Sequence, residues 1–223
     1  MTSFNALRLA GALATCTAFA TLGSLGAWPV AAHAGAYEDF FKAVAVDDGN
    51  GVQALLQRGF DPNSRDDKGQ LPLYLSLRDG SLKVATALLQ SPQIQVDLAN
   101  EAGETPLMMA ALKGQADWVQ RLVQRGAKIE RSGWTPLHYA ATGQQAAIVT
   151  WLLEHGAPVD ARSPNGSTPL MMAARYGSED AALLLLAKGA DARLRNERNL
   201  TAGDFARLAG RDKLGERLDQ AVR

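Results

Sequence analysis

Residues 103–111 read Gly103-Glu104-Thr105-Pro106-Leu107-Met108-Met109-Ala110-Ala111, and the same phrase recurs along the chain. Its copies are GWTPLHYAA at 133–141, GSTPLMMAA at 166–174 and a degraded GQLPLY at 69–74. The prolines of the four copies are spaced by 34, 30 and 33 residues, and a fifth copy begins with NLTA at 199–202. Repetition at a near-constant period predicts a stack of similar small units, because each unit can bury its apolar side only against its neighbours.

A second phrase, ending in glycine, closes most units. It is found as LLQRG at 55–59, LVQRG at 122–126, LLEHG at 152–156 and LLAKG at 185–189. Thr before Pro is a typical helix start, since the Thr side chain accepts a hydrogen bond from a free amide and a Pro there loses no bond. Glycines are predicted to stop the first helix at 80, 114 and 177, and the second helix at 126, 156 and 189. Each unit is therefore predicted to be a pair of helices.

These phrases resemble the ankyrin repeat, which has a period of about 33 residues and a T-P-L-H-x-A signature. The resemblance covers residues 37–223 and implies an all-α solenoid of about six helix-turn-helix units with short projecting β-turn fingers. The expected domain is 35–223, with units at 37–65, 66–99, 100–129, 130–162, 163–195 and 196–223.

Three departures from the repeat lead to specific expectations. Asn199 stands where the other units have glycine. After glycine, Asn is the residue that best tolerates the left-handed backbone conformation. Gly203 stands where the pattern has leucine, which predicts a loosely packed C-terminal unit. Three residues are missing between Ile129 and Gly133, so the finger there is predicted to be truncated.

The first 34 residues have the pattern of an export signal. They contain one charged side chain, Arg8, then an uncharged apolar stretch from Leu9 to Trp28 and an A-x-A site that ends at Ala34. A basic start, an apolar stretch and a small-residue site are typical of a secretory signal peptide, with cleavage expected near Ala34. A retained membrane anchor and a lipoprotein box at Cys16 are the alternatives.

The sequence offers little chemistry for catalysis. The expected mature chain has two histidines and no cysteine, and it lacks the metalloprotease, P-loop and nucleophile-elbow motifs. Residues 49–54 match a dinucleotide fingerprint only loosely, without the buried strand that such a site requires. Lys and Arg balance Asp and Glu at 23 each, so no general attraction to nucleic acid or lipid is expected. No catalytic residue, metal or cofactor is predicted.

By resemblance to the family, His138 is expected to link neighbouring loops through hydrogen bonds, and partners are expected to contact the finger tips and the exposed side of the first helices. Carried over by position, the candidate partner-binding residues are Asp67, Lys68, Gln70, Arg78 and Asp79; Glu101, Ala102, Glu104, Leu112 and Lys113; Arg131, Ser132, Trp134 and Thr142; and Pro164, Asn165, Ser167, Arg175 and Tyr176. Trp118 and Trp151 are expected to be packing residues, while the roles of the Met pairs stay open.

Together the signal and the resemblance indicate an exported bacterial protein, periplasmic or secreted. The expected function is that of a non-enzymatic protein-protein interaction module, a monomer that binds another protein and neither nucleic acid nor, once the signal is cleaved, a membrane. One alternative is an inhibitor or immunity protein that blocks a toxin or enzyme. The other is an enzyme or cofactor carrier with a site in the groove.

Overall fold

The computed structural model describes residues 30–221, with side chains from Gly35 onward. In this part of the chain the secondary structure is α-helical throughout. The helices are α1 (Val30–Ala45), α2 (Gly49–Gln57), α3 (Pro72–Asp79), α4 (Leu82–Gln90), α5 (Pro106–Leu112), α6 (Ala116–Gln124), α7 (Pro136–Thr142), α8 (Ala146–Glu154), α9 (Pro169–Tyr176), α10 (Glu179–Ala187), α11 (Ala202–Leu208) and α12 (Asp212–Gln220).

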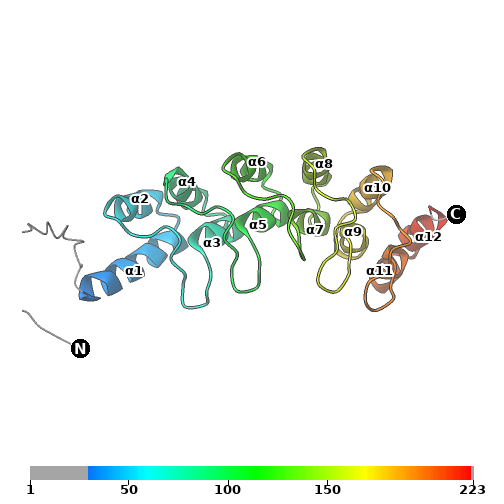
Figure 1. Ribbon diagram of the computed structural model, residues 1–223, viewed down its shortest axis with the longest axis horizontal. Helices are drawn as coiled ribbons and strands as arrows, with labels where there is room; N and C mark the ends of the chain where they lie inside the picture. The colour runs from blue at the N-terminus through cyan, green and yellow to red at the C-terminus, as the bar shows by residue number, and fades with distance from the viewer. Residues whose placement is uncertain (1–29, 222–223) are drawn as a thin grey trace, which may run out of the picture.

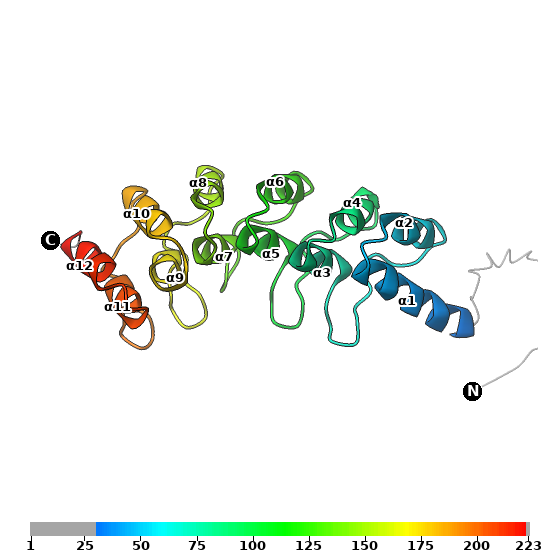
Figure 2. The same cartoon turned by 180° about the vertical axis from the view of Figure 1, so that it is seen from behind.

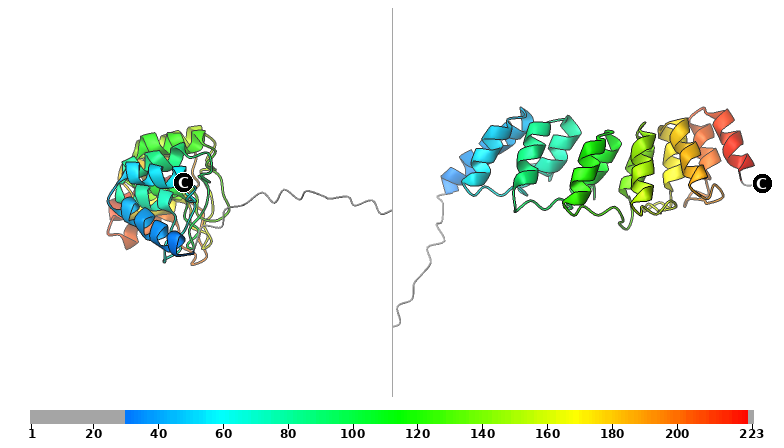
Figure 3. Two further views of the ribbon diagram at one scale, coloured as in Figure 1. Left: turned by 90° about the vertical axis from the view of Figure 1, so that its left-hand side faces the viewer. Right: turned by 90° about the horizontal axis from the view of Figure 1, so that it is seen from above.

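The helices form an elongated array of pairs (Figures 1 and 2). The inner row consists of α3, α5, α7, α9 and α11, whose neighbours pack directly against one another, and α2, α4, α6, α8 and α10 form the outer row. The long connections from each outer helix to the next inner helix all project on one side, as fingers (Figure 1). The view from above shows the pairs stacked side by side along one axis (Figure 3). The predicted solenoid is confirmed.

The inner helices begin where the sequence predicts. Helices α3, α5, α7 and α9 each start at the repeat proline. The Oγ1 atoms of Thr105, Thr168 and Thr201 accept hydrogen bonds from backbone amides three residues on, at 3.2–3.4 Å. Leu71 replaces Thr in the degraded copy, and α3 accordingly has no side-chain cap.

The helix stops predicted at glycines are confirmed at all six positions. Gly80, Gly114, Gly126, Gly156 and Gly189 have φ between 72° and 96°, in the left-handed region that favours glycine.

Gly177 ends α9 with an extended backbone, φ −85° and ψ −167°. The predicted helix stop is therefore confirmed at Gly177 as well, although this glycine is not in the left-handed region. It is glycine for another reason: a Cβ atom there would lie 2.0 Å from the carbonyl oxygen of Ala141. Its backbone thus fits directly against α7.

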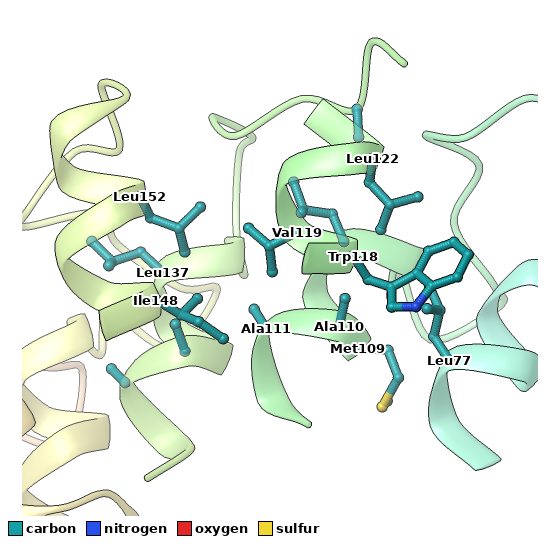
Figure 4. Packing of buried hydrophobic residues seen from close by; sticks show 14 of the residues in the cluster. Leu77, Met109, Ala110, Ala111, Trp118, Val119, Leu122, Leu137, Ile148 and Leu152 are labelled. Carbon is teal, nitrogen blue, oxygen red and sulfur yellow. The ribbon is translucent and has the colours of Figure 1, made fainter. Parts of the chain in front are cut away.

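Small side chains on the inner helices let the units stack closely. The alanine pairs Ala110–Ala111, Ala140–Ala141 and Ala173–Ala174 are buried, and the apolar stripes of the outer helices cover them. Figure 4 shows Trp118, Val119 and Leu122 of α6 pointing toward the inner helices. Leu77 of α3, one of these inner helices, is fully buried. The packing role predicted for Trp118 is confirmed, and Trp151 is half-buried with its ring stacked on His155.

The finger between α6 and α7 is shorter than the others. It comprises residues 125–135, whereas the finger between α8 and α9 comprises 155–168. The fingers on either side of it each close with a backbone hydrogen bond, from Asn100 N to Glu104 O at 2.9 Å and from Ser163 N to Ser167 O at 3.0 Å. The 125–135 finger has no counterpart of this bond. The predicted truncation is confirmed.

The C-terminal unit is more closely packed than predicted. A Cβ atom at Gly203 would lie 2.3 Å from Oδ1 of Asp219, and one at Gly215 would lie 3.1 Å from the carbonyl oxygen of Gly203. The expectation of loose packing is wrong, because the two glycines let α11 and α12 approach each other. Asn199 has φ 59°, so its predicted left-handed conformation is confirmed.

An aromatic cluster closes the N-terminal end. Phe40 is fully buried and stacks on Phe60, with ring centroids 4.3 Å apart, while the Tyr37 hydroxyl donates to the carbonyl oxygen of Arg65 at 3.0 Å. Residues 1–29 of the predicted export signal lie outside the described residues. The expected cleavage point after Ala34 falls within α1. None of the helices described here is long and apolar enough to span a bilayer.

Candidate functional site

The candidate site is the surface formed by the fingers and the exposed sides of the inner helices. At the finger tips Asp67, Lys68, Glu101, Ser132 and Asn165 are exposed to solvent. All of them were predicted as contact residues from their position in the repeat. The fingers project on one side of the array (Figure 1), so their tips form a single row.

Side chains at the base of the fingers hold the turns in place. Oδ1 of Asp66 accepts hydrogen bonds from the backbone amides of Lys68 and Gln70, at 2.9 and 2.7 Å. Oδ1 of Asn100 accepts from the amide of Glu104 at 2.9 Å. Short Asx side chains that satisfy backbone amides make such turns rigid. The finger tips are therefore presented on preformed loops.

His138 links two neighbouring units. Its ring is fully buried, and Nδ1 accepts from the backbone amide of Thr135 at 3.2 Å. Nε2 consequently carries the proton and donates to the carbonyl oxygen of Ser167, in the next finger, at 3.0 Å. Burial lowers the pKa of His138 to about 4. The structural role implied by the family resemblance is confirmed.

Methionines occupy the position of His138 in two other units. The sulfur atoms of Met108 and Met171 accept from the amides of Thr105 and Thr168, both at 3.4 Å. Each thioether thus caps its own helix, but it has no proton to donate to the next finger. His138 therefore makes a link between units that these methionines cannot make.

Glu104 joins three successive units. Its Oε2 accepts from the Tyr74 hydroxyl at 2.6 Å and its Oε1 from the Tyr139 hydroxyl at 2.9 Å. Burial alone would raise the pKa of Glu104, but the hydrogen bonds from Tyr74, Asn100 and Tyr139 hold the pKa below its ordinary value. Burial, followed by the bond to Glu104, raises the pKa of both tyrosines. This predicted contact residue is engaged within the chain, where it fixes the spacing of the inner helices.

An apolar depression of about 220 Å³ lies beside the truncated finger. Three inner helices contribute to it. Its lining residues are Leu112 of α5, Trp134, His138, Tyr139 and Thr142 of the fourth unit, and Met172 of α9. All of these except His138 are half-buried, and the Trp134 ring meets the His138 ring edge to face at 5.2 Å. A concave apolar site with few polar groups is a typical place for a ligand side chain.

The remaining candidate contact residues differ in whether their side chains are already bonded within the chain. Arg78 forms a close ion pair with Asp79, at 2.7 Å, and Arg131 lies 3.4 Å from Asp97. Gln70 accepts a hydrogen bond from Asn100.

Ser167 is only 1% exposed, so we leave it out of the surface proposed below. By contrast, Tyr176 is 52% exposed beside Arg175, whose guanidinium lies 5.1 Å from the tyrosine ring centroid. Ala102, Lys113 and Pro164 are also exposed.

Tyr139 was not predicted as a site residue, and the role of Met172 stayed open. Both occupy the position after the histidine of the T-P-L-H signature, in adjacent units, so the repeat register would have placed them side by side. The register does not show that a depression is left between these side chains, because the depression depends on the side-chain rotamers of residues on three helices.

Other hollows of the described surface are more open and polar. One lies between α2 and α4 and includes Asp47, Asp48 and Lys83, and a second follows α6 along Trp118 and Arg121. Among the described residues no three His, Cys, Asp or Glu side chains are grouped as a metal site would need.

The family model described as "Ankyrin repeats (3 copies)" matches residues 40–132 and 128–196, which together make up most of the chain. The chain therefore belongs to the ankyrin-repeat family, whose repeats are protein-protein interaction modules.

Curated relatives include Rabankyrin-5 of Homo sapiens, 30% identical over 176 residues, a match that covers 67% of this chain and 15% of the relative. The Ankyrin repeat and SAM domain-containing protein 6 of Rattus norvegicus is 30% identical over 147 residues, covering 66% and 13%. The Neurogenic locus notch homolog protein 4 of Homo sapiens is 38% identical over 72 residues, covering 32% and 4%. The chain thus spans less than a fifth of the length of these relatives.

Proposed function

We propose that this chain is an exported, non-enzymatic module that binds another protein in the bacterial periplasm. The partner lies against the finger tips and the exposed side of α5, α7 and α9, and the bound module is a monomer. The observation that carries this proposal is the apolar depression beside the truncated finger, in the middle of the row of exposed finger tips.

The rigidity of the surface supports the proposal. Hydrogen bonds within the chain fix the fingers and inner helices in the absence of a partner. They are made by the Asx turns, by His138 and by Glu104. A preformed surface loses little conformational entropy on binding, so more of its contact energy contributes to affinity.

The export part of the proposal rests on the first 34 residues, where a basic start, an apolar stretch and an A-x-A site follow in order. Mass spectrometry of the intact protein isolated from its native cells tests it. The expected mature chain begins at Gly35. A chain that keeps residues 1–34 and fractionates with membranes would show instead that the segment is an anchor.

Site-specific photo-crosslinking in native cells tests the binding surface. A photoreactive amino acid at Ser132 or Asn165, both exposed in the fingers, is expected to capture the same partner protein. Gln90 and Gln120 are exposed on the outer helices and serve as matched controls that should capture little. Equal capture from the outer helices would contradict the proposed surface. A single stoichiometric partner held at about 1 nM or tighter would indicate an inhibitor or immunity protein.

A further inference from the structure

We propose that the surface binds a lysine side chain of its partner protein, with the alkyl chain of that lysine in the depression beside the truncated finger and its ammonium group at Glu104. This inference rests on the proposed function and deepens it by naming the partner side chain. Two features of the structure support it: a carboxylate beside the depression and the apolar lining of the depression.

The Glu104 carboxylate lies directly beside the depression. Its Oε1 accepts a hydrogen bond at 2.9 Å from the hydroxyl of Tyr139, which is one of the lining residues. Both residues are only partly buried. An alkyl chain that lies along the Tyr139 ring therefore ends close to this carboxylate.

The negative charge of Glu104 has no cation paired with it. Its hydrogen bonds come from Tyr74, Asn100 and Tyr139, which are neutral donors. Burial alone would raise the pKa of Glu104, but these bonds hold the pKa below its ordinary value, so the carboxylate stays ionised. Among the described residues it takes part in no ion pair. A partly buried negative charge of this kind is complementary to a cation on a partner.

The same carboxylate determines the electrostatic environment of the lining. Burial, followed by the hydrogen bond to Glu104 and the charge of Glu104, raises the pKa of Tyr139, and no cation of the described chain contributes to this shift. Arg78 does act on Tyr74, the other tyrosine bonded to Glu104, but its guanidinium is paired with Asp79 at 2.7 Å. The depression therefore adjoins a negative charge that the chain itself does not neutralise.

The free acceptor capacity of Glu104 suits a single donor. Each carboxylate oxygen can accept two hydrogen bonds. Oε2 already accepts two, from Tyr74 at 2.6 Å and Asn100 at 3.0 Å, whereas Oε1 accepts one, from Tyr139. Arginine is favoured where it can donate to both oxygens at once, and here Oε2 is full. The compact ammonium group of lysine needs only the position left on Oε1.

The lining suits the alkyl chain of lysine. Leu112, Trp134 and Met172 present carbon and sulfur and are partly exposed. Lysine can place its methylene groups against such a surface while its charged end stays at the edge, where water reaches it. The faces of the Trp134 and Tyr139 rings can also attract the ammonium group.

Blocked peptides titrated against the mature chain, residues 35–223, test this inference. Their sequence is GSSXSSG, in which X is lysine, norleucine, arginine or glutamate. Norleucine keeps the alkyl chain of lysine and lacks its charge. The readouts are the methyl NMR signal of Met172 and the indole N–H signal of Trp134, with the buried Met108, Met171 and Trp118 as controls in the same spectra.

The lysine peptide is expected to shift the Met172 and Trp134 signals saturably, with a Kd below about 10 mM. The norleucine and glutamate peptides should bind at least about fivefold more weakly, because they lack the cation. The arginine peptide should bind no more tightly than the lysine peptide, since one acceptor position is free.

Variants separate the charge from the apolar contact. Glu104→Gln should weaken the lysine peptide to the level of the norleucine peptide and leave the norleucine peptide unchanged. Glu101→Gln, an exposed carboxylate of the same finger, is the matched control and should behave as the parent chain. Thr142→Phe fills the partly exposed edge of the depression and should weaken both peptides.

Three results would overturn the inference: a norleucine or glutamate peptide that binds as tightly as the lysine peptide, an arginine peptide that binds about tenfold more tightly, or Met172 and Trp134 signals that the lysine peptide does not move. These comparisons use the parent chain, so they decide the matter even if Glu104→Gln fails to fold.

Failure of the inference and failure of the proposed function can be told apart. If Ser132 captures its partner in cells equally well in the parent, Glu104→Gln and Thr142→Phe chains, the binding surface stands and this inference falls. If the lysine peptide binds as expected but the fingers capture nothing in cells, the lysine site stands and the proposed function falls.

Discussion

The residue that follows Thr-Pro-Leu determines how each unit is tied to the next. His138 reaches the carbonyl oxygen of Ser167, and Tyr74, in the same position of the second unit, reaches Glu104. Met108 and Met171 bond only within their own units. A change of one side chain at this position therefore adds or removes a hydrogen bond between repeats.

The buried imidazole of His138 should make stability depend on pH. The pKa of this ring is about 4 in the folded chain and 6.5 when unperturbed, so the unfolded chain binds more protons between these pH values. The stabilisation is complete above pH 6.5 and declines as the pH falls toward 4. Between pH 7.5 and 5 the free energy of unfolding should fall by about 2 kcal/mol from this group.

Urea unfolding at both pH values measures this effect, with His138→Met as the matched variant because methionine occupies the same place in two units. The variant should lose the bond to Ser167 and, with it, this part of the pH dependence. An identical pH dependence in the two proteins would exclude the buried neutral imidazole as its cause.

Asn199 holds the left-handed backbone that glycine holds in the other fingers, at φ 59°. Replacement by Ala should lower the free energy of unfolding by about 1 kcal/mol, because a β-carbon without a compensating polar group is disfavoured there. Asn199→Gly should leave stability within about 0.5 kcal/mol of the parent. Thermal unfolding of the two variants checks the difference, and equal losses in both would mean that the backbone conformation is not the reason for Asn.

At the level of whole helices, close approach between neighbouring helices accounts for three glycines. Gly177 fits its backbone against the carbonyl oxygen of Ala141, and Gly203 with Gly215 allows α11 to meet α12. Gly189, by comparison, is left-handed with no atom near the place of a Cβ. The two kinds of glycine should respond differently to substitution.

Gly189→Ala should cost about 1 kcal/mol of stability, from backbone strain alone. Gly177→Ala should cost more, about 3 kcal/mol, because the added carbon forces α9 away from α7. Denaturant unfolding of both variants gives the comparison. If Gly177→Ala proved the milder change, the contact between α7 and α9 would have to be looser than described.

Helix positions were predictable from the sequence because their causes are local. The prolines at 72, 106, 136 and 169 begin helices through their own geometry, and glycines follow the helix ends at the predicted positions. The close contacts of Gly177 and Gly203 were not predictable, since they depend on the distance between packed helices, α9 to α7 for Gly177 and α11 to α12 for Gly203. The pattern of the repeat suggested leucine at 203, and the structure requires a residue without a side chain.

The candidate site was predictable in outline for the same reason. Trp134, Leu112 and Thr142 were placed on the binding side by repeat register alone, and all three line the depression. Register did not reveal that Glu104 is bonded to Tyr74 and Tyr139, because those bonds join three units. Such contacts are set by rotamers and by the curvature of the stack.

For the molecule as a whole, the truncated finger is a local change in an otherwise regular array. Insertion of Gly-Ser-Asn between Arg131 and Ser132 would restore the usual length. Because the loop is at the surface and loop closure depends weakly on length, stability should change by less than about 1 kcal/mol. Partner binding should fall at least about tenfold, as the longer finger covers the entrance beside Trp134. Unchanged binding with unchanged stability would show that the gap is not an entry point.

In the proposed function, this ankyrin-repeat chain binds its partner on the side formed by the fingers and inner helices. Hydrogen exchange of the mature chain, alone and saturated with the partner identified by crosslinking, tests it most directly. Exchange should slow in the fingers around residues 100–104, 130–134 and 163–167, and should not change in α4, α6, α8 and α10. Slowed exchange confined to the outer helices would contradict it.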